Sequence, residues 1–255
     1  MKALILAGGA GTRLSPPGAG SPKPLTEIGG RPILWHVMKI YASHGISEFI
    51  VCLGGHAAHA IRTWFANSVD QSSDVRFNDA EGTVDIAFPD VERWDVKLVD
   101  TGDTTATAGR VKRALRFVSD AMFCLTYCDG LSDVNISTLV ATHEQAGATV
   151  TLTAVQVDAR FGVIELRNGR VREFREKPKS WVNGGFFVCS PDVDNFIVGD
   201  ADSWEYDVLP KIAGSGLLAA YEHDGFWQSM DTPQERDKLE ELWRSGEAPW
   251  RSWRV

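Results

Sequence analysis

Residues 3–14 read ALILAGGAGTRL, and residues 21–24 read SPKP. The first four form a short apolar run that is typical of a buried strand. Three glycines among residues 8–11 follow it, so that backbone N–H groups can come close to a ligand. Arg13 can hold phosphate oxygens with its planar guanidinium, and Lys23 adds a point charge between two prolines. A glycine-rich loop alone is typical of any tight turn after a strand, but the two cations favour a loop that binds a nucleoside triphosphate.

This stretch matches neither the GxGxxG motif that opens a helix nor a Walker loop that ends in Gly-Lys-Ser/Thr. L-A-G-G-x-G-T-R-L at 6–14, followed by P-K-P at 22–24, instead resembles the signature of the sugar-phosphate nucleotidyltransferases. The resemblance implies an α/β fold of the GT-A-like nucleotidyltransferase type. Such a fold is a Rossmann-like, doubly wound mixed sheet with a β-rich, sugar-binding subregion.

Length and charge narrow the class further. A chain of 255 residues fits one large α/β domain, and 44% hydrophobic with 24% charged residues is ordinary for a globular protein. The net charge of −8 argues against nucleic acid and anionic membranes as partners, because both favour a basic surface. We therefore expect neither partner, and phosphate binding has to depend on local cations.

The cysteine pattern and the N-terminus bear on location. The four cysteines (Cys52, Cys124, Cys128 and Cys189) form no CxxC pair and show no zinc-ligand spacing. They are typical of buried thiols in a reducing compartment. The N-terminal apolar run is too short for a signal peptide, and no segment approaches membrane-spanning length. The expected location is the cytoplasm.

Strands and helices alternate in the first half of the chain. Apolar runs predict strands at 3–6, 49–53, 96–99 and 123–127, and helical spacing predicts helices at 32–43, 56–66 and 111–118. Residues 67–93 show no clear periodicity, and we expect an excursion with short strands there. The repeated β-α units predict a mostly parallel sheet whose ligands bind beyond the carboxyl ends of the strands.

The second half is richer in strand patterns. Strands are predicted at 149–155 and 184–188, and 163–166 with 171–174 flank Asn168-Gly169, a strong signal for a two-residue hairpin turn. We expect a single domain over 1–255 rather than two domains joined by a linker. Its nucleotide-binding half would be 1–134, and its sugar-binding and oligomerisation half would be 135–255.

Two aspartates are candidates for holding a metal ion. Asp129 follows the strand at 123–127, and Asp231 stands in WQSMDTP at 227–233. Each has a plainer interpretation, because Asp129 could belong to a turn and Asp231 or Thr232 could cap a helix that begins at Pro233. Both segments resemble metal-binding segments of the family, and Mg²⁺ prefers one or two carboxylates together with phosphate oxygens. The resemblance therefore favours a pair of Mg²⁺ ligands.

FREKP at 174–178 and NGGFF at 183–187 are candidates for sugar binding. The plainer interpretation is the exposed, charged end of a hairpin. The resemblance implies that Glu176 accepts hydrogen bonds from sugar hydroxyls, that Lys177 holds the sugar phosphate and that Asn183 completes the pocket. It assigns the remaining sugar-phosphate contacts to Tyr127, Gly162 and Gly185.

Other segments resemble the cytidylyltransferase branch of the family, which joins CTP to glucose 1-phosphate: 27–36, 98–103 with 109–110, 160–162 and 248–250. The resemblance implies that CTP contacts Leu6, Ala7, Gly8, Gly9, Gly11, Thr12, Arg13, Lys23, Thr104, Thr105, Arg110 and Cys128. Arg13, Lys23 and Asp129 would be the catalytic residues. Ser21 stands where the family commonly has lysine, and Cys128 where it has glycine, so both bear on substrate choice.

The implied reaction is metal-assisted transfer of a nucleotidyl group. An oxygen of the sugar 1-phosphate would attack the α-phosphorus of CTP in line, and pyrophosphate would leave without a general base. Two alternatives stay open. One is a thymidylyl- or uridylyltransferase acting on the same or another sugar 1-phosphate, and the other is a non-catalytic subunit that senses nucleotide.

The tail from residue 243 to 255 holds Trp243, Trp250 and Trp253, and residues 67–93 add Phe77 and Phe88. Large aromatic side chains in poorly periodic segments either fold back on their own domain or lie in a subunit interface. The resemblance favours the second, a closed homo-oligomer, namely a hexamer, with the 67–110 region near a neighbour's site.

Overall fold

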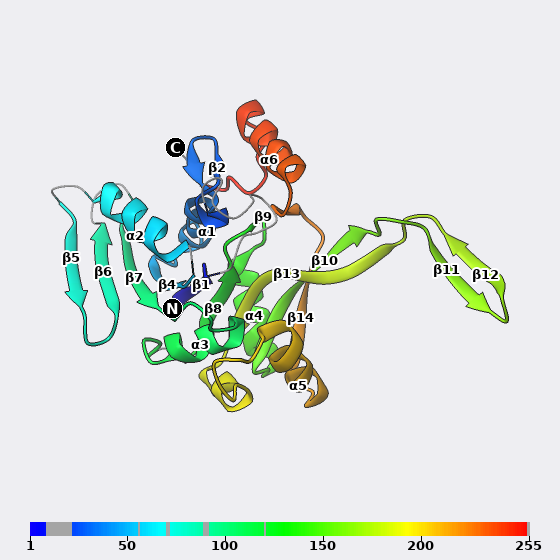
Figure 1. Ribbon diagram of the computed structural model, residues 1–255. Helices are drawn as coiled ribbons and strands as arrows, with labels where there is room; N and C mark the ends of the chain where they lie inside the picture. Colours follow the sequence, from blue (N-terminus) through cyan, green and yellow to red (C-terminus); the bar gives the residue numbers. More distant parts are fainter. Residues whose placement is uncertain (9–21, 56, 70–71, 89–91, 120, 254–255) are drawn as a thin grey trace.

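The computed structural model describes residues 1–8, 22–55, 57–69, 72–88, 92–119 and 121–253. Nine strands within these ranges form one mixed sheet in the order β14-β10-β13-β8-β1-β4-β7-β6-β5 (Figure 1). The strands are β1 (Lys2–Leu6), β4 (Glu48–Leu53), β5 (Asp74–Asn78), β6 (Thr83–Phe88), β7 (Trp94–Asp100), β8 (Phe123–Tyr127), β10 (Val150–Asp158), β13 (Lys179–Cys189) and β14 (Leu218–His223).

Three two-stranded ladders accompany the sheet: β2 (Glu27–Ile28) with β3 (Arg31–Pro32), β9 (Gly130–Ser132) with β15 (Trp227–Ser229), and β11 (Val163–Arg167) with β12 (Arg170–Arg175). The α-helices are α1 (Ile33–Ala42), α2 (Ala57–Ser68), α3 (Thr107–Leu115), α4 (Ile136–Ala146), α5 (Leu209–Gly214) and α6 (Pro233–Ser245). Shorter helical turns are η1 (Lys23–Leu25), η2 (Pro191–Phe196) and the π-helix η3 (Trp204–Val208).

The pairing confirms the predicted mixed, doubly wound α/β sheet. The central strands β8, β1, β4 and β7 are parallel neighbours, while β6 and β13 run antiparallel to the strands beside them. The sheet also crosses the predicted boundary at residue 134, because β13 from the second half pairs with β8 from the first. Both halves of the chain therefore share one sheet.

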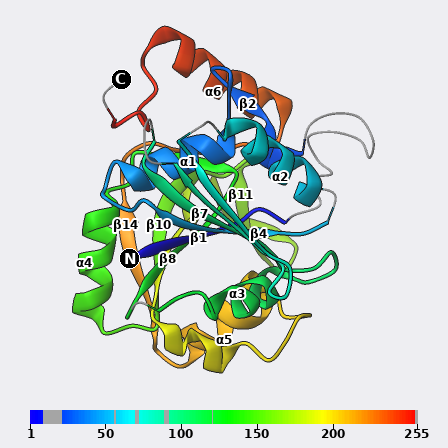
Figure 2. The same ribbon diagram turned by 90° about the vertical axis from the view of Figure 1, so that its left-hand side faces the viewer.

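Successive side chains of the central strands belong in turn to two apolar clusters, one on each face of the sheet. In β1, Ala3 and Ile5 join the cluster beneath α1 and α2, whereas Leu4 and Leu6 join the cluster beneath α3. Figure 2 shows α1, α2 and α6 on one side of the sheet and α3 and α5 on the other. This period of two is what a strand buried on both faces requires.

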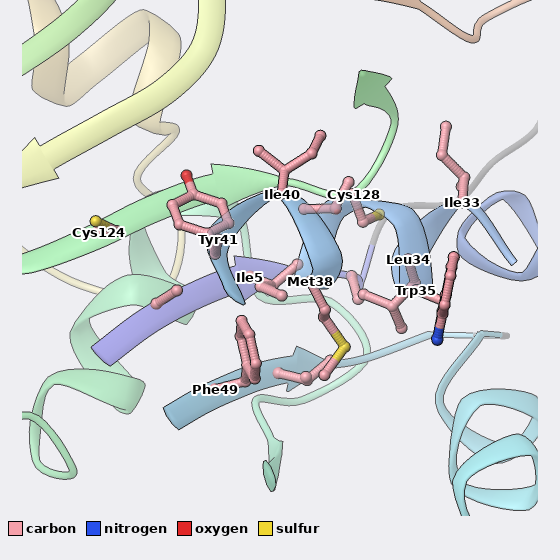
Figure 3. Packing of buried hydrophobic residues seen from close by; sticks show 14 of the residues in the cluster. Ile5, Ile33, Leu34, Trp35, Met38, Ile40, Tyr41, Phe49, Cys124 and Cys128 are labelled. Carbon is pink, nitrogen blue, oxygen red and sulfur yellow. The ribbon is translucent and has the colours of Figure 1, made fainter. Parts of the chain in front are cut away.

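The helix α1 is the apolar centre of the first face. Eight of its ten residues are buried; Met38 lies near Ile5 of β1 and Phe49 of β4, and Tyr41 lies over β8, beside Cys124 (Figure 3). Each large aliphatic side chain buried in this way contributes about 1.5–3 kcal/mol. Burial on nearly all sides therefore fixes α1 against the sheet.

Most predicted elements of the first half are confirmed, with shifted ends. The helix predicted at 111–118 is α3, which begins earlier, at Thr107, because carbonyls of Asp200 and Asp202 accept from the N–H groups of Ala106 and Ala108. The excursion at 67–93 contains β5 and β6, which extend the sheet. The sequence patterns did not predict α4, η2, η3, α5 or β14.

The predicted hairpin forms an arm, which we define as residues 160–178. Asn168 and Gly169 have φ angles of 52° and 73°, the left-handed conformation that a type I′ turn needs. Every residue of β11 and β12 is exposed, and Figure 1 shows the arm projecting away from the rest of the molecule. Its base is closed by the Ala159 N–H, which donates to the carbonyl of Pro178 (3.0 Å).

The tail folds back on its own domain, so the expectation of a subunit interface is wrong for Trp250, while Trp243 and Trp253 stay partly exposed. Trp250 is fully buried, and Trp243 and Trp250 pack edge-on against the ring of His36, with centroids 4.7 and 6.2 Å away. Trp253 packs on Trp35 in the same way. Trp35 and His36 of α1 thus pack against these tryptophans, where the sequence led us to expect another subunit.

Two further observations concern cysteines and helix length. All four cysteines are free thiols and buried, as predicted. No helix in the described ranges combines the length and apolar character needed to cross a membrane.

Candidate active site

The carboxyl ends of β1, β4, β7 and β8 lie at the same edge of the sheet, next to one cavity. Leu6 pairs with both Cys52 and Tyr127, and Cys52 pairs with Val99. The cavity beyond this edge has a volume of about 590 Å³. It is lined by Leu6, Gly8, Lys23, Pro24, Asp103, Thr104, Thr105, Ala106, Thr107, Arg110, Tyr127, Cys128, Asp129, Asn183 and Glu205. This is the place where doubly wound sheets bind their ligands.

A cluster of Lys23, Asp129 and Asp231, which we call the cation cluster, lies at one side of the cavity. The Lys23 ammonium donates to Asp129 Oδ2 (2.6 Å) and to Asp231 Oδ1 (2.7 Å). Burial disfavours the charged lysine, but the two carboxylates outweigh that cost and hold its pKa above the ordinary 10.5. Three residues far apart in the sequence therefore form one charged centre.

Short antiparallel pairing brings the two aspartates together. β9 follows Asp129 and pairs with β15, which precedes Asp231, so that Gly130 lies opposite Ser229. The Met230 N–H also donates to the carbonyl of Asp129 (2.8 Å). The main chains on either side of the two carboxylates are thus hydrogen-bonded to each other.

Thr232 resolves the helix-cap alternative at Asp231. Its hydroxyl accepts from the N–H of Glu235, whose carboxylate accepts from the N–H of Thr232, and together they form a capping box at the start of α6. The Asp231 side chain is therefore left to contact Lys23.

The cation cluster fits a divalent metal ion. Among the described residues, no three histidine, cysteine, aspartate or glutamate side chains gather as ligands. Yet two carboxylates already converge on a single ammonium group, and Mg²⁺ typically takes one or two carboxylates and completes its shell with phosphate oxygens and water. The donor set therefore suits Mg²⁺ held jointly with a phosphorylated substrate.

Arg110 is the second cation of the cavity, and the backbone is built around it. It is 5% exposed, and its Nη1 donates to the carbonyls of Leu53 and Gly102 and to Thr101 Oγ1, at 2.7–3.0 Å. Burial lowers the pKa of Arg110, although a guanidinium stays charged near neutral pH. Arg110 lines the cavity, and its contact with nucleotide stays a prediction.

Two glycines make room for Arg110. A Cβ on Gly54 would lie 1.8 Å from Arg110 Nη1, and one on Gly8 would lie 2.5 Å from Arg110 Cζ. Neither contact is possible without moving the guanidinium. Gly8 thus has a steric reason to be glycine besides the predicted approach to phosphate.

The loop after β7 carries the predicted nucleotide contacts Thr104 and Thr105, and both line the cavity. The loop is fixed at its start by the N–H of Thr101, which donates to the carbonyl of Leu53 (2.9 Å). It is fixed further along by Asp103 Oδ1, which accepts from the N–H of Gly55 (3.0 Å). The two threonines are therefore presented from a loop that is bonded to the end of β4.

Tyr127 and Asn183 form another wall of the cavity, and Gly185 packs behind Tyr127 without lining the cavity. Gly185 has a φ of 81°, and a Cβ there would lie 2.8 Å from the Tyr127 ring, so glycine is required to pack this tyrosine. The register between β10 and β13 shifts here, because Phe187 pairs with Leu152 whereas Asn183 pairs with Ala154. The resulting bulge is a common way to direct a side chain toward a site.

The structure does not bring the other predicted sugar contacts to the cavity. Glu176 and Lys177 are exposed and stand on the arm, as does Gly162, and none of the three lines the cavity. Gly162 is close to the arm's own residues, since a Cβ there would lie 2.8 Å from the Phe174 ring and 3.0 Å from Glu176 Oε2. Their role toward sugar phosphate stays a prediction.

Some predicted residues contribute differently, and some cannot be placed. Gly9, Gly11, Thr12 and Arg13 lie outside the described residues. Ala7 is buried and its N–H donates to the carbonyl of Cys52 (3.1 Å), so it anchors the start of the loop.

Cys128, the residue that departs from the family pattern, lines the cavity while its side chain is almost fully buried. Burial, and then the neighbouring Asp129, raise the pKa of its thiol, which is neutral at physiological pH. The thiol therefore adds bulk rather than charge beside the cation cluster.

Sequence reasoning missed Asp103, Thr107 and Glu205, which also line the cavity. Asp103 and Thr107 adjoin the predicted Thr104 and Thr105, so their position next to that segment was the available signal. Glu205 lies in a π-helix, in a part of the chain for which no element was predicted, and nothing in the local pattern indicates it.

Comparison with known proteins agrees with this geometry. The family model described as nucleotidyl transferase matches residues 2–235, and the chain belongs to this family of enzymes. The chain is 48% identical to the glucose-1-phosphate cytidylyltransferase of Salmonella typhimurium, over 99% of this chain and 100% of that protein. It is 29% identical to the mannose-1-phosphate guanyltransferase of Aspergillus oryzae, over 94% of this chain and 62% of that protein.

Solved structures share the fold. The crystal structure of HddC from Yersinia pseudotuberculosis superposes with a TM-score of 0.69, over 95% of this chain and 99% of that chain. Its sequence identity of 22% supports the fold alone.

Proposed function

We propose that this nucleotidyltransferase transfers the cytidylyl group of CTP to α-D-glucose 1-phosphate and gives CDP-glucose and pyrophosphate. The observation that carries the substrates is the end-to-end relation to a glucose-1-phosphate cytidylyltransferase, at 48% identity. The cation cluster at the carboxyl edge of the sheet supports the reaction type, because phosphoryl chemistry needs positive charge and carboxylates for a metal ion at one place.

The residues act mainly by positioning and charge. Lys23 is held as an ammonium by Asp129 and Asp231, so it can stabilise negative charge that develops at the α-phosphate. Arg110 would bind the nucleotide from the floor of the cavity, with Thr104 and Thr105 beside it. The attacking oxygen of the sugar phosphate is already ionised at neutral pH, so no residue has to remove a proton.

Mg²⁺ is the metal ion that we propose for Asp129 and Asp231. Bound there, it would act as a Lewis acid that neutralises phosphate charge. The cavity wall of Tyr127 and Asn183 would bind the sugar, and Lys177 of the arm its phosphate.

Pyrophosphate release, measured with glucose 1-phosphate and each of CTP, UTP, dTTP, ATP and GTP, tests this function. We expect turnover with CTP to exceed that with each other nucleotide at least tenfold. Equal or greater turnover with dTTP or UTP would overturn the choice of nucleotide and favour the thymidylyl- or uridylyltransferase alternative. No release with any of the five would favour the non-catalytic alternative.

We also propose that the chain forms a closed homo-oligomer, namely a hexamer, and acts in the cytoplasm. Exposed apolar side chains support assembly: Phe77 on β5, and Leu166, Val171 and Phe174 on the arm, are each more than half exposed. Such side chains are enriched in subunit interfaces. Four free, buried thiols fit a reducing compartment.

A further inference from the structure

The carboxylate of Glu205 lies in the cavity and is held by hydroxyl groups. Tyr127 donates its hydroxyl proton to Glu205 Oε1 (2.5 Å), and Thr107 and Ser203 donate theirs to Oε2 (2.9 and 2.8 Å). Among the described residues, Glu205 makes no ion pair. Glu205 thus accepts three hydrogen bonds from neutral hydroxyl groups. A glutamine could not accept all three in the same positions, because the amide NH₂ group that replaces one oxygen is a donor.

The main chain around Glu205 is held by further hydrogen bonds, one of which ends on Thr107 of that network. In the π-helix η3 the Val208 N–H donates to the carbonyl of Ser203, five residues earlier (3.2 Å). Ser203 and Asp207 close the turn, since the Asp207 carboxylate accepts from the N–H of Ser203 (2.7 Å). Trp204 is fully buried, and its main-chain N–H donates to Thr107 Oγ1 (2.8 Å). Short π-helical turns are frequent at functional sites.

Tyr127 is also linked to Asn183, by packing through Gly185. The Gly185 N–H donates to Asn183 Oδ1 (2.9 Å), and a Cβ on Gly185 would lie 2.8 Å from the Tyr127 ring. The hydroxyl of that ring gives its proton to Glu205. Glu205 therefore helps to fix the ring against which the segment of Asn183 and Gly185 packs.

Charge argues against a direct role for Glu205 toward phosphate. The cavity has to receive two phosphorylated substrates, and a carboxylate on its wall repels them unless it faces their uncharged parts. Glu205 lies on the wall of Tyr127 and Asn183, whereas the carboxylates of the cation cluster contact Lys23. Its chemistry there is to accept hydrogen bonds.

We infer that Glu205 is a positioning residue for the sugar side of the site: it holds Tyr127, and through the packing of Tyr127 on Gly185 the neighbouring Asn183, in the orientation that binds the hydroxyl groups of the sugar 1-phosphate. This inference rests on the proposed function. It assigns a role to a residue of η3 that neither the sequence motifs nor the family resemblance indicated.

The test compares Glu205→Gln with Tyr127→Phe and with the double variant, using steady-state kinetics for each substrate. We expect Glu205→Gln to raise KM for glucose 1-phosphate about tenfold or more, and to leave KM for CTP within about twofold. We expect the double variant to lose no more than the worse single variant, because both changes break the same link. The matched control is Glu241→Gln, an exposed glutamate on α6, which should change neither constant.

Several results would overturn the inference: equal losses for both substrates, unchanged constants, or losses of the two single variants that multiply in the double variant. If Glu205→Gln does not fold, Tyr127→Phe alone tests the same link, since it keeps the ring and removes only the hydroxyl. The wild-type substrate panel is measured first. If another sugar phosphate proves to be the substrate, KM for that sugar phosphate and KM for the nucleotide are compared in the same variants. Failure of the proposed substrate can therefore be told apart from failure of the inference about Glu205.

Discussion

The cation cluster and the arm both carry residues that the family resemblance assigns to substrates, but the fold holds them in different ways. Asp129 and Asp231 flank the paired strands β9 and β15, and Lys23 lies between their carboxylates. Glu176 and Lys177 stand on a two-stranded hairpin, exposed to solvent on both faces. An isolated hairpin of this kind is marginally stable in water.

This difference shows that the chemistry of a side chain does not by itself determine where the fold places it. In the body of the molecule, strand pairing and apolar packing on both faces decide where each charged group lies. On the arm, hydrogen bonds hold the two strands together, yet nothing in the described structure fixes the arm against the cavity. A sugar-phosphate contact from the arm therefore requires the arm to approach a cavity, its own or that of another copy.

The largest effect should come from breaking the cation cluster. Asp129→Asn and Asp231→Asn each keep the shape of the side chain and remove a charge that faces Lys23. We expect turnover to fall about a hundred- to a thousandfold in each, because charge stabilisation of the reacting phosphate is lost. Asp237→Asn, an exposed position on α6, is the control. Near-normal turnover in both cluster variants, with intact thermal unfolding, would contradict the assignment.

The second prediction concerns the buried His36 and the dependence of folding stability on pH. His36 is fully buried: its Nε2 donates to the carbonyl of Ile28 (2.8 Å), and its Nδ1 accepts from Trp250 (3.3 Å), which requires the neutral ring. Burial lowers the pKa of His36 from 6.5 to about 4. The unfolded chain thus binds the proton more tightly. The stability that neutral His36 contributes is complete above pH 6.5 and is lost as pH falls toward 4, by about 3 kcal/mol in all.

Chemical denaturation between pH 7 and 4 measures this loss. His36→Gln should reduce the dependence of the unfolding free energy on pH relative to the parent, at a cost in stability at pH 7. His59→Gln, at an exposed position on α2, should leave the pH dependence of the parent unchanged. If His36→Gln retains the parent's full pH dependence, His36 is not the group responsible.

A smaller effect is expected on the arm. Lys177→Ala removes a cation that is predicted to hold the phosphate of glucose 1-phosphate. Such a charge-assisted contact contributes about 1.5–3 kcal/mol, so KM for glucose 1-phosphate should rise roughly ten- to a hundredfold while KM for CTP changes little. Lys179→Ala, exposed at the start of β13, is the control. Equal losses for both substrates, or none, would mean that the arm does not reach a sugar phosphate.

The smallest effect on folding should come from the apolar face of the arm. Leu166 and Val171 pair across the hairpin and are 63% and 56% exposed. Replacing both with threonine should change the free energy of unfolding of a single subunit by no more than about 0.5 kcal/mol. Light scattering should show a smaller assembly if this face lies in the subunit interface. A monomeric mass for the active parent would contradict the proposed oligomer, and an unchanged assembly in the variant would place the interface elsewhere.

Local patterns were sufficient for most strands and helices of the first half, although not for β5 and β6 or for the start of α3. The strand at 3–6, the helix from Pro32 and the Asn168-Gly169 turn all depend on neighbours within a few residues, so the sequence contains the cause of each. The proposed metal pair was suggested for a different reason, because Asp129 and Asp231 stand in motifs that resemble a family. The helix α4 was missed although its ends carry local signals, the Asn135 cap and Gly147 in the left-handed conformation. The π-helix η3 is held by tertiary contacts such as those with Thr107.

By itself, then, the sequence determined the order of the first strands and the class of enzyme, and it predicted a phosphate-binding role for the loop at 6–24. Only the tertiary structure decided that Lys23 sits between two aspartates, that Thr232 rather than Asp231 caps α6, and that the tail tryptophans enclose His36 of the same chain. It also decided that Glu205 enters the cavity and that Lys177 stands apart from it. The physical reason is distance along the chain: the Lys23–Asp231 contact joins residues 208 positions apart, and such a contact depends on how whole strands pair rather than on any local pattern.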